Sequence, residues 1–306
     1  MNVMILSNSA YLKHAYTLLY SLFFNHPEEP MDIYLPYEDI TEKELAEFCS
    51  YVASFPGKKL YPLYVGDEFK QKVVVRNGLT AETYYRILGI SLLPKDMERI
   101  LYLDVDMIVK GSLKALYETN ITNAPFAVCE DIFGIINGFH EANKRRMNIP
   151  KEYSYFNAGV MVYNLEYLRK ENAVEEMLRR IYKDYERYEY CDQDVMNEMY
   201  YDKLVYVGWD EYNCPPVWCY INKEKLAEGA LEFADYNQIR ELSGNPEVLM
   251  QKYQNVTQQI YENAKIIHYP GNTKPWSTTR EASRLYEMFD EVYKMCTEAM
   301  KGQGIL

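Results

Sequence analysis

Apolar runs and segments of helical periodicity alternate along the first third of the chain. Four apolar runs have the length of buried strands, and they lie at residues 3–6, 32–35, 60–65 and 100–103. Three segments between them repeat apolar residues at three- and four-residue intervals, as one face of a helix does, and they span 11–25, 41–54 and 80–92. Strands that alternate with helices predict an α/β fold with a mostly parallel central sheet flanked by helices. Ligands of such sheets bind at the carboxyl ends of the strands.

The second half of the chain is less regular. Apolar runs predict further strands at 126–129, 159–163 and 266–269. The pattern at 165–188 predicts one long amphipathic helix, and shorter helical patterns begin near 192 and 280. Residues 210–260 are rich in Pro, Gly and polar turns, so we interpret them as excursions between elements. These patterns predict one domain over 1–276 and a C-terminal helical segment over 277–306 that packs on it.

Composition restricts the classes of partner. The 306 residues are 48% hydrophobic and 25% charged, which is typical of a globular chain. A formal net charge of -12 argues against a nucleic-acid partner held by a broad basic face. An anionic ligand would need local positive charge.

Cysteine spacing and hydropathy indicate the compartment. The six cysteines are scattered without framework spacing, so reduced thiols are expected. The longest apolar stretch, 15–24, is far shorter than the roughly 20 residues of a membrane span, and no signal-peptide pattern opens the chain. Residues 280–306 carry four bases against five acids, which predicts at most peripheral membrane contact. A cytoplasmic protein is therefore expected, and the oligomeric state is open.

Two aspartates stand two residues apart at the end of one predicted strand. In extended backbone, residues i and i+2 share a face, so Asp104 and Asp106 should converge while Val105 points back into the core. Two like charges at a strand end repel each other, and a hard divalent cation relieves the repulsion. An isolated Asp-x-Asp pair more often begins a solvated turn, but the buried run ahead of this pair favours a metal site.

A histidine at the end of the predicted strand 266–269 precedes a Pro-Gly turn and a lysine. His268 can supply an imidazole ligand, and Lys274 can reach a phosphate group. Taken singly, such a histidine is more often structural and such a lysine more often faces solvent. Their combination with the two aspartates supports the functional interpretation. Mixed carboxylate and imidazole ligation suits Mn²⁺ better than Mg²⁺.

Two polar segments lie between these motifs. Asn157, Ala158 and Gly159 form a small polar step at the mouth of a strand, where backbone can approach a ligand closely, although an ordinary loop-to-strand junction has the same pattern. The segment 192–194 opens a predicted helix, where its two aspartates can serve as capping residues alone. As functional groups, these side chains would line a pocket for a hydroxyl-rich substrate.

Together the motifs resemble those of glycosyltransferase family 8, which includes bacterial lipopolysaccharide galactosyl- and glucosyltransferases and glycogenin. Five motifs occur in the family's order over residues 1 to about 276, and they are Thr83 to Arg86, Tyr102 to Asp106, Phe156 to Val160, Asp192 to Asp194, and His268 to Gly271 with Lys274 to Trp276. The resemblance implies a Rossmann-like GT-A catalytic domain. It also implies metal-dependent transfer of glucose or galactose from a UDP-sugar to a glycan or glycolipid acceptor, with retention of anomeric configuration.

The resemblance also implies roles for individual residues. The metal, Mn²⁺ or in second place Mg²⁺, would be held by Asp104, Asp106 and His268. The diphosphate would meet Gly271 and Lys274, and Arg86 would meet the diphosphate or the donor sugar. The donor sugar would be surrounded by Asp131, Asn157, Gly159, Asp192 and Gln193, of which Asp131, Asp192 and Gln193 form the catalytic set. Val105 and Ala158 complete the donor-binding set with their neighbours.

One departure concerns the nucleotide base. The family often has an aspartate two residues ahead of an Asn-Tyr pair after the first strand, whereas this chain has Asn8 and Tyr11. An amide offers both a donor and an acceptor to uracil, and Tyr11 could stack on the base, so UDP remains the expected nucleotide.

Retention leaves the mechanism open. Gln193 is an uncharged amide and a poor nucleophile. Asp192 or Asp194 could attack instead, as carboxylates do in retaining glycosidases. We favour a same-face mechanism, in which the leaving phosphate takes the acceptor proton and Gln193 steadies an oxocarbenium-like centre.

Two other classes of protein share parts of the pattern. Haloacid-dehalogenase phosphatases also carry Asp-x-Asp after an apolar run, but normally on the first strand. A self-glycosylating or sugar-nucleotide-binding scaffold is the non-enzymatic alternative, because 31 tyrosines offer many acceptor hydroxyls. Tyrosines are explained more simply as amphipathic packing residues.

Overall fold

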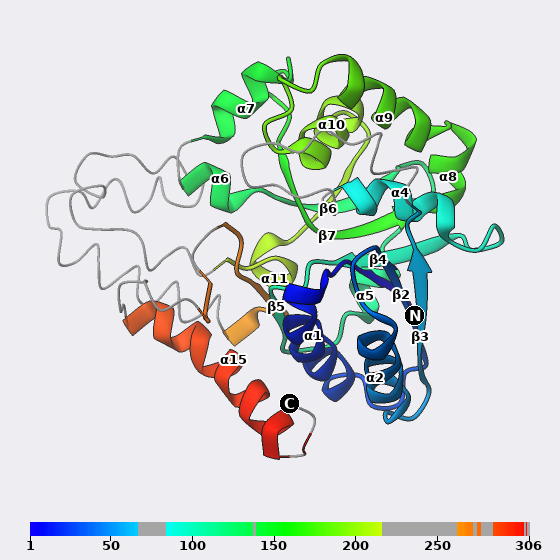
Figure 1. Cartoon of the computed structure of the whole chain (residues 1–306). Coiled ribbons are helices and arrows are strands. Elements are labelled where there is room, and N and C mark those ends of the chain that lie inside the picture. Colours follow the sequence, from blue (N-terminus) through cyan, green and yellow to red (C-terminus); the bar gives the residue numbers. More distant parts are fainter. Residues whose placement is uncertain are drawn as a thin grey trace, which may run out of the picture.

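A seven-stranded mixed sheet forms the centre of the molecule (Figure 1). The computed structural model describes residues 1–66, 84–136, 139–215, 262–271, 274–276, 284–302 and 304. The strand order is β3-β2-β1-β4-β7-β6-β8. The strands are β1 (Asn2–Ile5), β2 (Met31–Tyr37), β3 (Lys58–Tyr64), β4 (Arg99–Leu103), β6 (Phe126–Glu130), β7 (Phe156–Asn164) and β8 (Val205–Val207).

The direction of each strand determines which strand ends lie side by side in the sheet. The pairs β1–β2, β2–β3, β1–β4 and β6–β8 are parallel. Strand β7 is antiparallel to both β4 and β6. The start of β7 therefore lies beside the end of β4, at the edge where parallel strands present their carboxyl ends. The expected mostly parallel sheet flanked by helices is confirmed, with β7 as its reversed member.

Helices bury both faces of the sheet because successive strand side chains alternate between the faces. One face packs against α1 (Leu12–Phe24) and α2 (Glu42–Ala53), with Val3, Ile33 and Leu101 among its fully buried side chains. The other face packs against α4 (Tyr85–Leu92), α8 (Leu165–Lys170), α9 (Ala173–Lys183) and α10 (Cys191–Tyr200). Figure 1 shows these two helical layers on opposite sides of the sheet.

A second sheet of two strands lies outside the central one. Strand β5 (Met107–Val109) pairs in antiparallel fashion with β9 (Ile266–His268), so two segments far apart in the sequence lie side by side. The remaining helices are η1 (Ser9–Tyr11), α5 (Lys114–Tyr117), α6 (Ile132–Ile136), α7 (His140–Arg146), α11 (Trp209–Tyr212) and α15 (Arg284–Gly302). Helix α15 contacts α1.

The prediction of one long helix at 165–188 is wrong. The segment forms two helices, α8 and α9, and the second ends at Lys183. Asn172 lies between them in the left-handed region, with φ 48° and ψ 39°, so the helical path breaks there. The apolar spacing continues across the break because both helices pack on the same core, which is why periodicity alone predicted one helix.

Other predictions were close in position. The strand predicted from 159 begins at Phe156, so the polar step lies inside β7. Strands β5 and β8 were not predicted. Most of the segment 210–260 and the start of the helix predicted at 80–92 lie outside the described residues, as do the side chains at 284–289 and 292.

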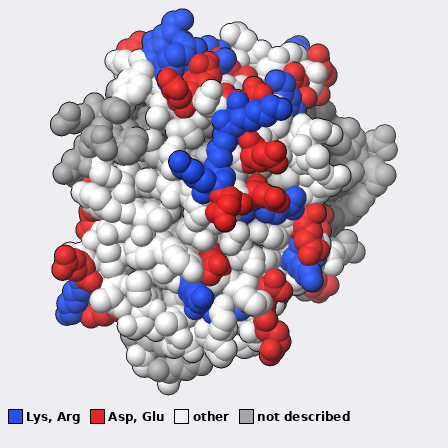
Figure 2. All heavy atoms as spheres, turned by 90° about the vertical axis from the view of Figure 1, so that its right-hand side faces the viewer, with Lys and Arg blue, Asp and Glu red and all other residues white. Residues whose placement is uncertain are grey.

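Charged side chains of both signs intermix on the molecular face shown in Figure 2, where uncharged surface separates the clusters. A membrane-spanning helix, which must be long and apolar, is not found in the described part of the chain.

We expect Asn172→Ala to destabilise the protein by about 1–2 kcal/mol, because a Cβ-bearing residue other than Asn or Asp is disfavoured in the left-handed conformation. Asn172 is exposed and its side chain makes no capping hydrogen bond, so little else is lost. Asn172→Gly is the matched control and should unfold in urea at close to the wild-type midpoint. An Ala variant as stable as wild type would show that the break between α8 and α9 does not depend on this residue.

Candidate functional site

The end of β4 and the start of β7 form the floor of the site. Leu103 pairs with Val160, and the Asp104 N–H donates to the Gly159 carbonyl oxygen at 2.9 Å. The reversed direction of β7 therefore brings the polar step at 157–159 beside the first aspartate. Val105 is buried against the α1 side of the sheet, as the alternation of the strand predicted.

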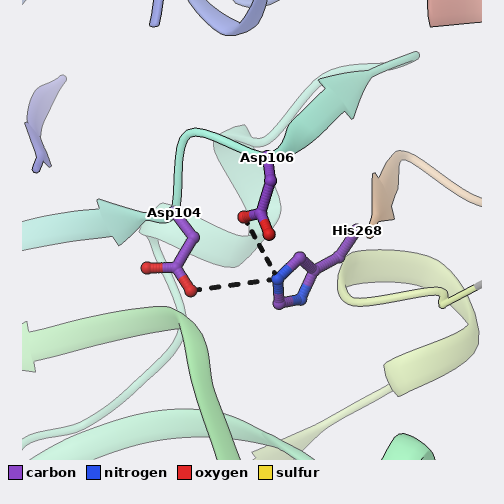
Figure 3. A group of neighbouring side chains, drawn as sticks. All are labelled: Asp104, Asp106 and His268. Carbon is purple, nitrogen blue, oxygen red and sulfur yellow. Dashed lines mark ion pairs between the residues drawn. The ribbon is translucent and has the colours of Figure 1, made fainter. Parts of the chain in front are cut away.

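Three potential metal ligands converge above this floor (Figure 3). One ligand atom from each of Asp104, Asp106 and His268 lies within 4.8 Å of the other two. His268 Nε2 is 3.8 Å from Asp104 Oδ2 and 3.4 Å from Asp106 Oδ1. The pairing of β5 with β9, which puts Met107 opposite His268, brings the imidazole to the aspartates. Two carboxylates and one imidazole fit a divalent cation.

Lys274 supplies positive charge on one side of this cluster. Its ammonium group donates to the Asp106 carboxylate and, at 2.7 Å, to the Tyr269 carbonyl oxygen. Burial alone would raise the pKa of the Asp106 carboxyl, but the Lys274 ammonium and the His268 imidazole together hold that pKa below its usual range. Asp106 is thus an anion in the neutral pH range.

Arg86 supplies positive charge on the other side. Its guanidinium lies 3.2 Å from Asp104 Oδ1 and 2.5 Å from Asp192 Oδ2, and it donates to the Ala158 carbonyl oxygen at 2.7 Å. The guanidinium also lies over the Tyr102 ring, 4.8 Å from its centroid. Burial raises the pKa of the Asp192 carboxyl to about 7, although the Arg86 charge opposes this rise.

Gln193 is held by both ends of its amide. Its Oε1 accepts from the Ala158 N–H at 2.9 Å, and its Nε2 donates to the Tyr155 hydroxyl at 3.2 Å. The Tyr155 hydroxyl in turn donates to Asp194 at 2.5 Å. Asp194 also accepts from Arg146 and from the Tyr190 N–H, so its carboxylate is saturated by structural partners. The first turn of α10 thus contributes Asp192 and Gln193 to the site and keeps Asp194 beneath it.

Asp131 and Gly271 also line the site. Burial raises the pKa of the Asp131 carboxyl to about 6, although the Gly134 N–H donates to it at 3.0 Å. Gly271 has a φ of 75°, and an added Cβ there would lie 2.8 Å from the Phe133 ring. A glycine is therefore required at this position by both conformation and space.

A cavity of about 490 Å³ unites most of these groups. Its polar walls are Arg86, Asp104, Asp106, Asp131, Asn157, Asp192, Gln193 and His268, and its other lining residues are Phe133, Phe139, Glu189, Tyr190, Pro270 and Gly271. Phe133, Phe139 and Tyr190 were not anticipated from the sequence, because an isolated aromatic residue in an irregular segment is more often a packing residue.

Asn8 and Tyr11 do not contribute to this cavity lining. The Asn8 side chain accepts from the Tyr11 N–H at 2.9 Å and so caps η1. Tyr11 is 40% exposed and packs edge-on against Trp276, with ring centroids 6.2 Å apart. Since Trp276 follows Lys274 by two residues, the two predicted base-binding residues lie next to the segment that carries the lysine.

Comparison with known proteins identifies relatives of this chain. The family model "Glycosyl transferase family 8" matches residues 2–280. General stress protein A of Bacillus subtilis is 30% identical over 224 residues, 71% of this chain and 66% of that protein. Lipopolysaccharide 1,2-glucosyltransferase of Escherichia coli K12 is 28% identical over 194 residues, 63% of this chain and 48% of that protein. The chain thus spans about half to two thirds of the length of these curated relatives.

Solved structures share the fold. The galactosyltransferase LgtC, in complex with donor and acceptor sugar analogues, superposes with a TM-score of 0.68 at 19% identity, covering 99% of this chain and 100% of that one. An active-site mutant of LgtC gives a TM-score of 0.73 at 19% identity over 100% of both chains. The fold is therefore that of the GT-A glycosyltransferases, and the family match favours a transferase over the phosphatase alternative.

Gly159 leaves space that the metal-ligand cluster needs. A Cβ at this position would lie 2.5 Å from His268 Cε1 and 3.0 Å from Asp104 Oδ2. We expect Gly159→Ala to displace the buried imidazole, to weaken Mn²⁺ binding by about 10-fold or more, and to lower stability by about 1–3 kcal/mol. Titration with Mn²⁺ monitored by electron paramagnetic resonance measures the affinity, and urea unfolding measures the stability.

Gly302→Ala is the control, because a Cβ there meets nothing within 4 Å. Wild-type Mn²⁺ affinity in the Gly159→Ala protein would contradict the placement of His268 against this glycine.

Proposed function

The chain belongs to glycosyltransferase family 8, and we propose that it transfers glucose or galactose from a UDP-sugar to a saccharide or glycolipid acceptor with retention of configuration. The observation that supports this proposal most directly is the convergence of Asp104, Asp106 and His268 on one wall of a polar cavity. Lipopolysaccharide 1,2-glucosyltransferase is among the relatives, which favours a glycan of that kind as acceptor.

Asp104, Asp106 and His268 would hold the divalent cation. When bound there, such a cation supplies positive charge to the donor diphosphate and to the leaving nucleoside diphosphate. Because the ligand set combines carboxylate oxygens with one imidazole nitrogen, we propose Mn²⁺ ahead of Mg²⁺. Lys274 and His268 lower the pKa of the Asp106 carboxyl, so this group is an anion even before a cation binds.

Lys274 and Arg86 would bind the anionic part of the donor. Both cations lie against the aspartate pair, Lys274 on Asp106 and Arg86 on Asp104. A departing diphosphate gains negative charge in the transition state, and fixed cations in a partly buried cavity stabilise that charge. Together with the divalent cation, these two side chains would supply the local positive charge that an anionic donor needs in a chain with a net charge of -12.

The contacts of the catalytic set favour a same-face mechanism. Gln193 is uncharged and both of its amide atoms are hydrogen-bonded, which suits orientation of a sugar rather than attack on it. Asp192 is held by the Arg86 guanidinium, so its lone pairs are only partly available. We propose that the leaving phosphate takes the acceptor proton while the Gln193 carbonyl dipole faces the developing positive charge.

The aromatic part of the cavity would receive the acceptor. Phe139 stacks on Tyr190 with ring centroids 5.6 Å apart, and Phe133 packs against Phe139 at 5.9 Å. These rings line the same cavity as the aspartates, and aromatic rings can pack against the carbon side of a sugar ring. A cavity lined by both polar groups and aromatic rings fits a reaction between two saccharides.

Release of UDP tests the function. We expect release from UDP-glucose or UDP-galactose to exceed release from their N-acetylated analogues, to be faster with Mn²⁺ than with Mg²⁺, and to stop after exhaustive chelation. Asp106→Asn should abolish release and keep the native circular dichroism spectrum, because it removes a charge at the sheet edge rather than an apolar core contact.

Asp202→Asn is the matched control, because Asp202 is an exposed aspartate just after α10, and it should retain wild-type release. Full turnover in the chelated protein would exclude the metal-dependent reaction. Unfolding of the Asp106→Asn protein would assign that aspartate a structural role.

Replacement of Gln193 tests the mechanism. We expect Gln193→Ala to slow UDP release by roughly 10- to 1,000-fold, because an orienting amide typically contributes about 1–4 kcal/mol. Gln193→Glu should trap no long-lived covalent intermediate. Mass spectrometry of the wild-type protein quenched during turnover should find no hexose adduct. An adduct on Gln193 would overturn the same-face mechanism, and an adduct on Asp192 or Asp194 would identify a carboxylate nucleophile.

A further inference from the structure

Asn213 connects two residues of the site without lining the cavity. It follows α11 and is 5% exposed. Its Oδ1 lies 2.7 Å from His268 Nδ1, and its Nδ2 lies 3.0 Å from Asn157 Oδ1. One side chain thus touches both a proposed metal ligand and a proposed donor-sugar ligand.

The Gly159 N–H determines the direction of every hydrogen bond in the series that runs from Asn157 through Asn213 to His268. The Gly159 N–H donates to an Asn157 side-chain atom at 3.0 Å, and a backbone N–H can only donate, so that atom must be the carbonyl oxygen Oδ1. The Asn213 atom that faces Asn157 Oδ1 must then be the donor Nδ2. The remaining Asn213 atom, Oδ1, is an acceptor, so His268 Nδ1 must carry a proton.

The direction of these hydrogen bonds determines which atoms His268 and Asn157 leave available to a ligand. With Nδ1 protonated, His268 keeps Nε2 as its ligand atom, and Nε2 is the nitrogen that faces Asp104 and Asp106. With Oδ1 occupied by two donors, Asn157 has its Nδ2 group left to donate to a ligand in the cavity that it lines. The cavity therefore presents an acceptor at His268 and a donor at Asn157.

The backbone around Asn213 keeps this geometry in place. The Asn213 N–H donates to the Trp209 carbonyl oxygen at 2.9 Å, and Cys214 forms a bridge with Ile267 beside His268. The His268 N–H itself donates to the Cys214 carbonyl oxygen at 2.9 Å. Asn213 and His268 are thus fixed to each other through main chain as well as side chain.

We propose that Asn213 is a positioning residue that transmits to His268 the hydrogen-bond polarity fixed by the Gly159 N–H at Asn157. It holds His268 in the tautomer that offers Nε2 to a divalent cation, and together with the Gly159 N–H it holds Asn157 in the amide orientation that offers Nδ2 to a hydroxyl of the donor sugar. This inference rests on the proposed function for its two ligands, but the tautomer and the amide orientation belong to the protein alone.

Two substitutions separate the two contacts. Asn213→Asp keeps an acceptor for His268 Nδ1 but can no longer donate to Asn157. Asn213→Leu has a similar size and removes both contacts. We expect the Leu protein to bind Mn²⁺ about 10- to 100-fold more weakly, as is typical when the partner of a ligating imidazole is lost. The Asp protein should bind Mn²⁺ at least as tightly as wild type, and its KM for the UDP-sugar should rise about 10-fold.

Three measurements test these expectations. Electron paramagnetic resonance gives the Mn²⁺ affinity in the absence of donor, and UDP release gives the KM. Nitrogen-15 NMR of the metal-free protein at pH about 9, where an ordinary imidazole is neutral, shows which nitrogen of His268 carries the proton. Asn164→Asp is the control, because Asn164 caps α8 at the opposite end of β7 and should leave all three results unchanged.

The outcomes distinguish this inference from the proposed function. A proton on His268 Nε2 in wild type, or equal Mn²⁺ affinity in the wild-type and Leu proteins, would overturn the role of Asn213. Weaker Mn²⁺ binding by the Asp and Leu proteins alike would show that Asn213 acts as a structural residue only. Absence of both Mn²⁺ binding and UDP release in wild type would contradict the proposed function, while the NMR result would still test the polarity. If the Leu protein does not fold, the Asp protein and the NMR measurement test the role of Asn213.

Discussion

The Arg86 guanidinium lies between two carboxylates, and the rest of the site depends on this arrangement. Asp104 arrives on β4 and Asp192 on α10, and the same guanidinium also binds the Ala158 carbonyl oxygen on β7. Without that cation, the pKa of the buried Asp192 carboxyl would rise further and the half-buried Asp104 carboxylate would lose its ion pair. One side chain from α4 therefore joins β4, α10 and β7, and it supplies the positive charge that the two carboxyl groups would otherwise lack.

The fold was largely predictable because its elements are long enough to show periodicity. Strands β1, β2 and β4 are apolar runs, and α1 and α2 have one apolar stripe each. Strands β5 and β8 escaped prediction, although β9, which also has three residues, was predicted from the apolar run at 266–269. The reversal of β7 also escaped it, because strand direction is determined by tertiary connections and leaves no local pattern.

The site was predictable where local geometry determines it and not where distant segments meet. Alternation along a strand places Asp104 and Asp106 together, and motif order connects them with His268. Asn213 gave no signal, because it follows a helix of four residues and its partner lies 55 positions away. The prediction that Asn8 and Tyr11 bind the base stays a prediction, since Asn8 caps η1 and Tyr11 packs on Trp276.

The aromatic stack beside Lys274 connects helix α15 to the segment that borders the candidate site. Trp276 lies flat on His14 with ring centroids 3.4 Å apart, and His14 Nδ1 is 2.6 Å from the Tyr293 hydroxyl of α15. Burial lowers the pKa of His14 to about 4, so this imidazole is neutral and suited to stacking. Any truncated version of the protein that omits α15 would lose support beneath the segment that carries Lys274.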